Sequence, residues 1–213
     1  MPAYAGAWIA PEGGQEIVTT VVGERNELRF YESAAYWEVP LGVGDSVVAA
    51  PWLEQNYESF DGWRAEATLG WKHAIRRDGG IVMAVQAGAL WISHPPLGCS
   101  EGGAELRWLG GRAFENGAFL NAEAATRMLD GGCGGERLDL TAGARFADNW
   151  LAMGQVFIDM PREGRGEDYV KAQVSLVRFG ESGRGIQLGV RARVDGGGAE
   201  PALVLGFWGR PGR

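Results

Sequence analysis

Charged side chains of both signs recur singly among apolar residues along most of this sequence. Charges spaced in this way suit two kinds of chemistry once the chain folds. They can pair across an enclosed space, or they can line a water-filled path and select among polar solutes. The residues that we predict to line such an interior are Arg64, Glu66, Lys72, Glu105, Arg107, Glu123, Arg127, Arg137, Asp139, Arg145, Asp159, Lys171, Arg191 and Arg193.

Candidates for a catalytic or metal site are few. His94 is one of two histidines, and Ser93 or Ser100 is the only nucleophile expected beside it. No carboxylate lies at a spacing that would orient this histidine, and the sequence has no G-x-S-x-G, phosphate-loop or CxxC motif. His94 also lacks the tight spacing to Cys99 and Cys133 that is typical of a zinc site. We therefore predict no enzyme activity, no metal and no cofactor.

The two cysteines, Cys99 and Cys133, each lie in a glycine-rich segment that we expect to be a loop. Both loops are expected at the same end of the fold, separated by one hairpin, so that the two sulfurs can reach bonding distance. A disulfide would suit an oxidising compartment, whereas an intracellular pair would be spectator thiols. The sequence leaves these two interpretations open.

Apolar and polar residues alternate with a period of two over runs of ten or more residues, which is the pattern of β-strands with two different faces. In residues 63–76, Leu69 and Trp71 fall on one face, and Glu66 and Lys72 fall on the other. The same alternation predicts strands over 16–24, 27–39, 46–56, 63–76, 81–92, 104–114, 119–129, 137–146, 150–160, 169–179, 185–194 and 202–209.

The connections between these strands alternate in length. Short turns, such as 42–45 and 77–80, are followed by longer polar segments. Tight turns at one end and wider loops at the other are typical of up-and-down barrels of the outer-membrane kind, and an even strand number places both termini at the same end. The longer segments are 57–62, 93–102, 130–136, 161–167 and 195–200.

Strand length and aromatic placement favour a barrel that spans a membrane. About ten tilted residues cross the apolar core of a bilayer, whereas soluble strands average about five or six. Aromatic residues gather near strand ends, among them Trp63, Trp91, Phe179 and Trp208, as in girdles at membrane interfaces. A basic residue facing lipid at mid-depth costs ~2–4 kcal/mol, so the charged faces must line the lumen. We predict an all-β, antiparallel, up-and-down transmembrane β-barrel of about 12 strands.

Length and composition narrow the remaining possibilities. A chain of 213 residues fits one domain, which we place at 6–213. Residues 1–5 contain Ala3-Tyr4-Ala5, which has the form of a signal cleavage site, and we interpret them as the remnant of a signal peptide. The net charge of −7, without a basic stripe, argues against nucleic acid as a partner.

Two segments carry a resemblance to known proteins. The opening GAWIAPEGGQ, residues 6–15, resembles G-A-W-x-x-P-x-G-x-G-Q, the mature start of a group of poorly characterised Gram-negative outer-membrane barrel proteins that are often labelled as transporters. Residues 36–47 are similar to their strand–turn–strand unit. The resemblance implies a barrel in the outer membrane and brings no catalytic residues. Residues 203–208 look like a closing strand of such barrels, which implies outer-membrane lipid and the outer-membrane assembly machinery as partners.

The leading functional hypothesis is an outer-membrane barrel that acts as a narrow channel or transporter for small polar solutes, or as a structural barrel with a plugged lumen. The alternative is a secreted or periplasmic carbohydrate-binding module of jelly-roll type, in which some of the nine tryptophans stack on sugars. A third hypothesis is a lipid-modifying barrel enzyme that uses His94. Girdle tryptophans point outward at strand ends, whereas sugar platforms gather on one concave face.

Overall fold

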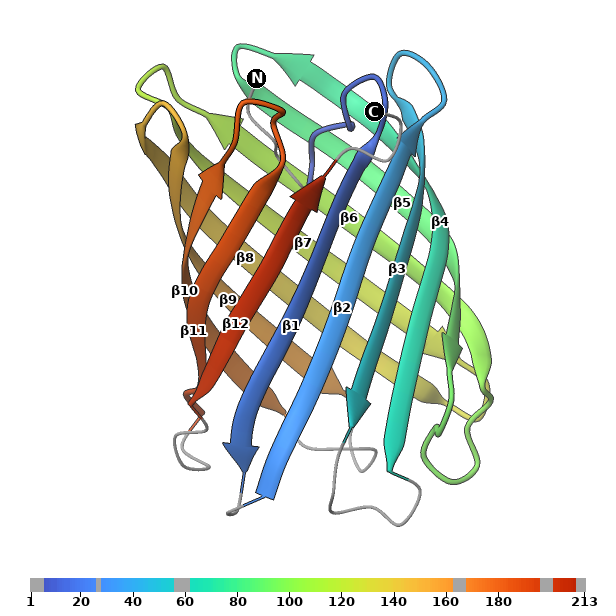
Figure 1. Cartoon of the computed structure of the whole chain (residues 1–213). Coiled ribbons are helices and arrows are strands. Elements are labelled where there is room, and N and C mark those ends of the chain that lie inside the picture. Colours follow the sequence, from blue (N-terminus) through green and yellow to red (C-terminus); the bar gives the residue numbers. More distant parts are fainter. Residues whose placement is uncertain (1–5, 26–27, 56–61, 163–167, 196–200, 210–213) are drawn as a thin grey trace.

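The computed structural model is a closed barrel of twelve antiparallel strands, in which β1 pairs with β12 to close the wall (Figure 1). The structure describes residues 6–25, 28–55, 62–162, 168–195 and 201–209, so the expected signal-peptide remnant at 1–5 lies outside the described residues. The strands are β1 (Gln15–Arg25), β2 (Leu28–Pro40), β3 (Asp45–Gln55), β4 (Trp63–Asp78), β5 (Ile81–Ile92), β6 (Gly102–Ala113), β7 (Ala118–Leu129), β8 (Cys133–Ala147), β9 (Trp150–Pro161), β10 (Tyr169–Phe179), β11 (Gly185–Arg193) and β12 (Ala202–Gly209).

The predicted fold class is confirmed, and so are most strand limits. Three predicted strands, 81–92, 169–179 and 202–209, coincide with β5, β10 and β12, and all the others except β8 differ by one or two residues at an end. No helix within the described residues is long and apolar enough to cross a membrane.

The prediction of a loop over 130–136 is wrong, because β8 begins at Cys133. Gly134 continues the ladder to β7, opposite Met128. A Cβ atom on Gly134 would lie 2.0 Å from the carbonyl oxygen of Arg127, and the φ angle of the residue is 115°. Only glycine tolerates both that approach and that backbone conformation. A glycine that indicated a loop in the sequence therefore extends the strand.

Alternation divides the strands into a luminal and an outer face, as predicted. On β4, Glu66 and Lys72 point inward and are 7% and 0% exposed, whereas Leu69 and Trp71 on the outer face are 61% and 47% exposed. Among the large apolar side chains exposed on the outer face, leucine and valine are the most frequent, followed by aromatic residues, which suits contact with hydrocarbon and its interfaces.

The aromatic residues near strand ends divide between the two faces. Trp63 and Trp91 are half exposed on the outer face, as expected for a girdle. Phe179 and Trp208 instead point into the lumen, where their ring centroids lie 6.0 Å apart in a T-shaped arrangement. Strand parity explains the difference, because Phe207 faces outward and its neighbour Trp208 must then face inward.

The two ends of the barrel differ in the lengths of their connections (Figure 1). At one end, which we call the short-turn end, β1 begins and β12 ends. At the other, the long-loop end, the described connections include 93–101 and 130–132, and the predicted loops 57–62, 161–167 and 195–200 lie largely outside the described residues. The turns at the short-turn end are 41–44, 79–80, 114–117, 148–149 and 180–184.

Candidate functional site: the lumen

The beginning of the described chain fills the lumen at the short-turn end. Residues 6–14, which we call the N-terminal segment, precede β1 and fold back into the barrel opening (Figure 1). The backbone N–H of Ala7 donates to Oδ1 of Asn121 on β7 at 3.0 Å, and that of Ala10 donates to Oε1 of Glu38 on β2 at 3.0 Å. Both alanines are buried. The segment is thus bonded to two well-separated parts of the wall.

A buried lysine holds this segment in place. The Nζ atom of Lys72 lies 2.9 Å from the carbonyl oxygen of Gly6, 2.8 Å from that of Trp8 and 2.7 Å from Oε2 of Glu38. The side chains of Lys72 and Glu38 are both 0% exposed. Glu38 also accepts hydrogen bonds from Tyr36 at 2.6 Å and Ser46 at 2.7 Å, so the buried pair is well satisfied.

The indole ring of Trp8 anchors the segment on its apolar side. It packs against a cluster that includes Val82 and Leu109, and its ring centroid lies 6.3 Å from that of Phe119. A Cβ atom on Gly111 would lie 2.4 Å from the Trp8 ring, so glycine at this position makes room for it. The sequence did not reveal this contact, because residues 6–14 have no periodicity.

Arg107 is the centre of a second group of charges, deeper in the lumen. Its guanidinium lies 3.2 Å from Glu105, 2.8 Å from Glu123 and 3.4 Å from Asp139. The three carboxylates come from β6, β7 and β8, and each lies on the predicted inward face. Neighbouring strands therefore converge on one cation.

Glu66 joins strands that are not neighbours in the wall. It reaches Arg64 on its own strand at 2.9 Å, Arg127 on β7 at 2.7 Å and Arg137 on β8 at 3.8 Å. Arg137 in turn pairs with Asp159 at 2.6 Å. All of these residues lie within a few positions of the strand ends at the long-loop end, so the ion pairs cross the lumen in that half of the barrel.

A third group lies toward the long-loop end. Glu32 on β2 contacts Lys171 on β10 at 3.2 Å and also pairs with Arg191 on β11. Arg193 pairs with Asp195 at 2.7 Å. Of the predicted basic lumen residues, Arg145 alone has no carboxylate partner among the described residues; its guanidinium lies 4.9 Å from the Phe179 ring centroid.

The prediction from sequence missed Glu32 and Glu38. Both occupy even-numbered residue positions of β2, whose side chains point inward, so alternation along the strand could have identified them as lumen residues. The prediction also missed the uncharged polar residues of β9, β10 and β11. Gln155, Gln173 and Gln187 point inward and bond to one another or to Ser175. They carry no charge, so nothing in the sequence marks them as lumen residues apart from alternation.

The candidate nucleophile and base lie outside the lumen. Ser93 Oγ is 2.9 Å from His94 Nδ1 and accepts a hydrogen bond from the backbone N–H of Ala65 at 2.8 Å. Within the described part of the chain, no carboxylate accepts a hydrogen bond from His94, and no group of histidine, cysteine and carboxylate residues is arranged to hold a metal ion.

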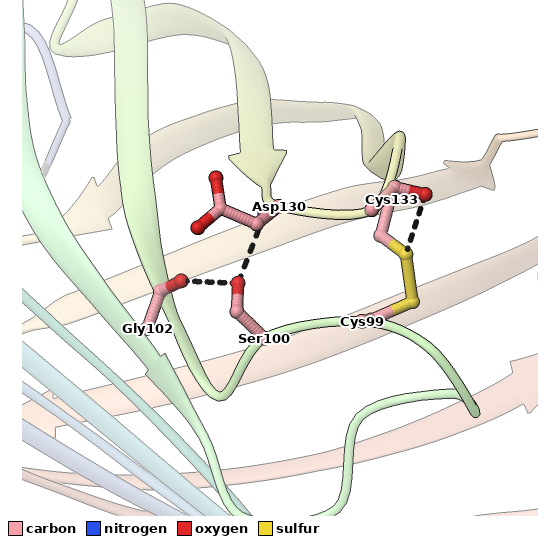
Figure 2. The surroundings of a disulfide bond; sticks show 6 residues. Cys99, Ser100, Gly102, Asp130 and Cys133 are labelled. Carbon is pink, nitrogen blue, oxygen red and sulfur yellow. Dashed lines mark hydrogen bonds between the residues drawn. A yellow bond between two sulfur atoms is a disulfide. The ribbon is translucent and has the colours of Figure 1, made fainter.

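At the long-loop end, Cys99 and Cys133 form a disulfide with their Cα atoms 5.8 Å apart (Figure 2). The surrounding loops are also joined by Ser100, whose hydroxyl donates to the carbonyl of Gly102 at 2.7 Å and accepts from the N–H of Asp130 at 2.9 Å. The 93–101 loop is therefore fixed to the start of β8 by a covalent bond and to the β7–β8 connection by a hydrogen bond.

We expect the purified protein to contain no free thiol until it is reduced. Alkylation with and without reductant, read by mass spectrometry, should label both Cys99 and Cys133 only after reduction. The Ser100→Ala variant serves as a control, because it removes the hydrogen bonds and leaves the covalent bond. Labelling of either cysteine in unreduced, folded protein would contradict the bonded arrangement.

The outer wall carries an apolar groove of about 870 Å³ over β7 to β12. Its lining includes the small residues Ala142, Ala144 and Ala152 and the larger Leu120 and Leu176. The groove belongs to the surface that faces hydrocarbon and is separate from the charged lumen.

No family model and no curated protein matches this sequence. Among solved structures, the barrel is similar to KdgM porin, with 6% identity and a TM-score of 0.64 over 90% of this chain and 97% of that chain. It is similar to an outer membrane channel from Pseudomonas putida F1, with 8% identity and a TM-score of 0.64 over 98% of both chains. Outer membrane phospholipase A from Escherichia coli matches at 13% identity and a TM-score of 0.51, over 92% of this chain and 91% of that chain. The chain therefore has the fold of the outer-membrane β-barrels.

Proposed function

We propose that this protein is a narrow channel for small polar solutes in the outer membrane of a Gram-negative bacterium. The observation that carries the proposal is a polar inner wall that continues along the barrel axis inside an apolar outer wall. Trp208 Nε1 donates to Gln187 at 2.8 Å, and Gln187 donates to Ser175 at 3.0 Å. Gln173 also donates to Ser175, at 3.0 Å, and accepts from Arg191 at 2.9 Å. This chain of polar groups links the short-turn half to the charges near the long-loop end.

The N-terminal segment closes the path in this conformation. It occupies the short-turn opening, and Lys72, Glu38 and Asn121 hold its backbone. Solutes then pass only when the segment moves. A barrel of about twelve strands is intermediate between filled eight-stranded barrels and open porins, so one short segment is enough to block it.

Two observations bear on the other functional hypotheses. The closed up-and-down barrel is not a jelly roll, and Trp37, Trp63, Trp71 and Trp108 point outward from several strands instead of gathering on one concave face. For the lipid-modifying enzyme, the Ser93–His94 contact is the relevant feature, and within the described residues no carboxylate is bonded to His94. We propose a channel without enzymatic activity.

The outer-membrane assembly machinery is the partner that we propose for insertion. β12 alternates and ends in aromatic residues, with Leu203, Leu205 and Phe207 on the outer face. This is the form expected of a closing strand.

Conductance in planar bilayers tests the channel. The full chain should give small, infrequent openings, and a variant that starts at Gln15 should conduct several-fold more, because the short-turn opening is then clear. The Val43→Ala variant is a control, since Val43 lies in an exposed short turn away from the segment. Absence of conductance from the shortened variant, folded as judged by its gel mobility before and after boiling, would reject the channel in favour of a structural barrel.

A further inference from the structure

The charges near the long-loop end are unequal in number, unlike the buried pair of Lys72 and Glu38. Lys171 and Arg191 share the single carboxylate of Glu32. Glu54 is the cross-strand neighbour of Glu32, but it lies on the far side of β2 from the two basic residues and opposite Arg64. The Lys171, Arg191 and Glu32 group therefore carries one net positive charge.

The two basic groups also have donors to spare. An ammonium group has three N–H donors, and Glu32 is the one acceptor of a hydrogen bond from Lys171 among the described residues. Arg191 uses Nη1 toward Glu32 and Nε toward Gln173, which leaves Nη2 without an acceptor in the described part of the chain. Unused donors on charged groups bind carboxylates strongly.

The fold keeps space open at this place. A small cavity of about 10 Å³ is lined by Phe30, Glu32, Lys171, Arg191, Ala192, Arg193 and Ala202. This volume is enough for one water-sized atom. The cavity can therefore hold one oxygen atom of a ligand while the remainder of the ligand extends into the lumen. Strands β1 and β12 lie between Glu32 and the two basic residues. Their small residues Gly23 and Ala202 leave space for the Glu32 side chain to extend over them, and Gly23 also makes room for the Phe30 ring.

Aromatic rings flank the charges. The Nζ atom of Lys171 lies 5.0 Å from the Tyr169 ring centroid, and the guanidinium carbon of Arg191 lies 5.1 Å from that of Phe157. The basic side chains are thus held against flat apolar surfaces, and their exposed fractions are 18% and 12%. An organic acid that carries a ring would find both a charge partner and a surface to pack against.

We propose that Lys171 and Arg191 form a luminal subsite for the carboxylate of a small, singly charged organic acid. The carboxylate of Glu32 already binds both basic groups and competes with the carboxylate of the ligand. The subsite rests on the proposed channel function and names the class of solute that the channel prefers. One net positive charge matches one carboxylate, so neutral solutes of the same shape should bind less well.

Binding of benzoate, with benzamide as its uncharged counterpart, tests the subsite in the full-length protein in detergent by saturation-transfer NMR. Benzoate should bind, and benzamide should bind at least about tenfold more weakly, the difference that ~1.4 kcal/mol makes. Lys171→Met should weaken benzoate binding, whereas Glu32→Gln should strengthen it, because the competing carboxylate is gone. Arg64→Met, which removes a different and half-exposed luminal cation, should change little.

Opposite responses to the two variants separate the subsite from a general loss of folding, because a misfolded barrel would not bind more tightly. Equal binding of benzoate and benzamide, or unchanged benzoate binding in Lys171→Met, would overturn the subsite even if the protein conducts. Charge-selective benzoate binding by a protein that does not conduct would support the subsite and reject the proposed channel.

Discussion

Replacing Lys72 with methionine should lower the free energy of unfolding by about 3–5 kcal/mol, because it leaves the Glu38 carboxylate buried without its cation. Both side chains are fully buried, and Lys72 also binds the carbonyl oxygens of Gly6 and Trp8. The substitution therefore removes the ion pair and the main polar anchor of the N-terminal segment together. Urea unfolding of the barrel in lipid vesicles, followed by tryptophan fluorescence, measures the loss.

The matched control lies on the same strand. Arg76 pairs with Asp78 at 2.8 Å, but these side chains are 53% and 61% exposed, so Arg76→Met should leave the free energy of unfolding nearly unchanged. The double variant Lys72→Met with Glu38→Gln should recover part of the loss, because the unpaired buried charge is removed. If Lys72→Met proves as mild as Arg76→Met, the buried pair does not hold the lumen together.

Replacing Leu140 with arginine should prevent assembly of the barrel into lipid vesicles. Leu140 lies in the middle of β8 on the outer face and is 40% exposed, so the new charge would meet hydrocarbon. The expected cost is ~2–4 kcal/mol for arginine at the bilayer midplane. The fraction that migrates differently before and after boiling on a gel reports the folded barrel.

The adjacent residue provides the comparison. Thr141 points into the lumen and contacts Gln155 at 3.4 Å, so Thr141→Arg introduces the same charge on the polar side of the wall. It should assemble far better than Leu140→Arg. Equal assembly of the two variants would show that the assigned outer face of β8 is not in lipid.

The number of strands and the direction in which their side chains point could be predicted from the sequence. Apolar residues must face the lipid and charged residues must face the lumen, so the two kinds alternate along each strand. Leu69 and Lys72 fall on opposite faces for this reason. The limit of β8 could not be predicted in the same way, since Gly134 has no side chain to reveal its face and its close approach to Arg127 exists only in the closed sheet.

The sequence could not predict which charged residues form ion pairs inside the lumen. The inward direction of Glu66 follows from alternation, but its contacts with Arg127 and Arg137 depend on how far the strands shift around the closed wall. The position of the N-terminal segment depends equally on this closure. Trp8 has no periodic neighbours, and its site is built from β5, β6 and β7.

The contacts of the N-terminal segment have a consequence for the order of assembly. They reach β2 through Glu38, β4 through Lys72 and β7 through Asn121, and β7 is the seventh of the twelve strands to be synthesised. We therefore expect these nine residues to complete their contacts in the lumen only after β7 has joined the sheet.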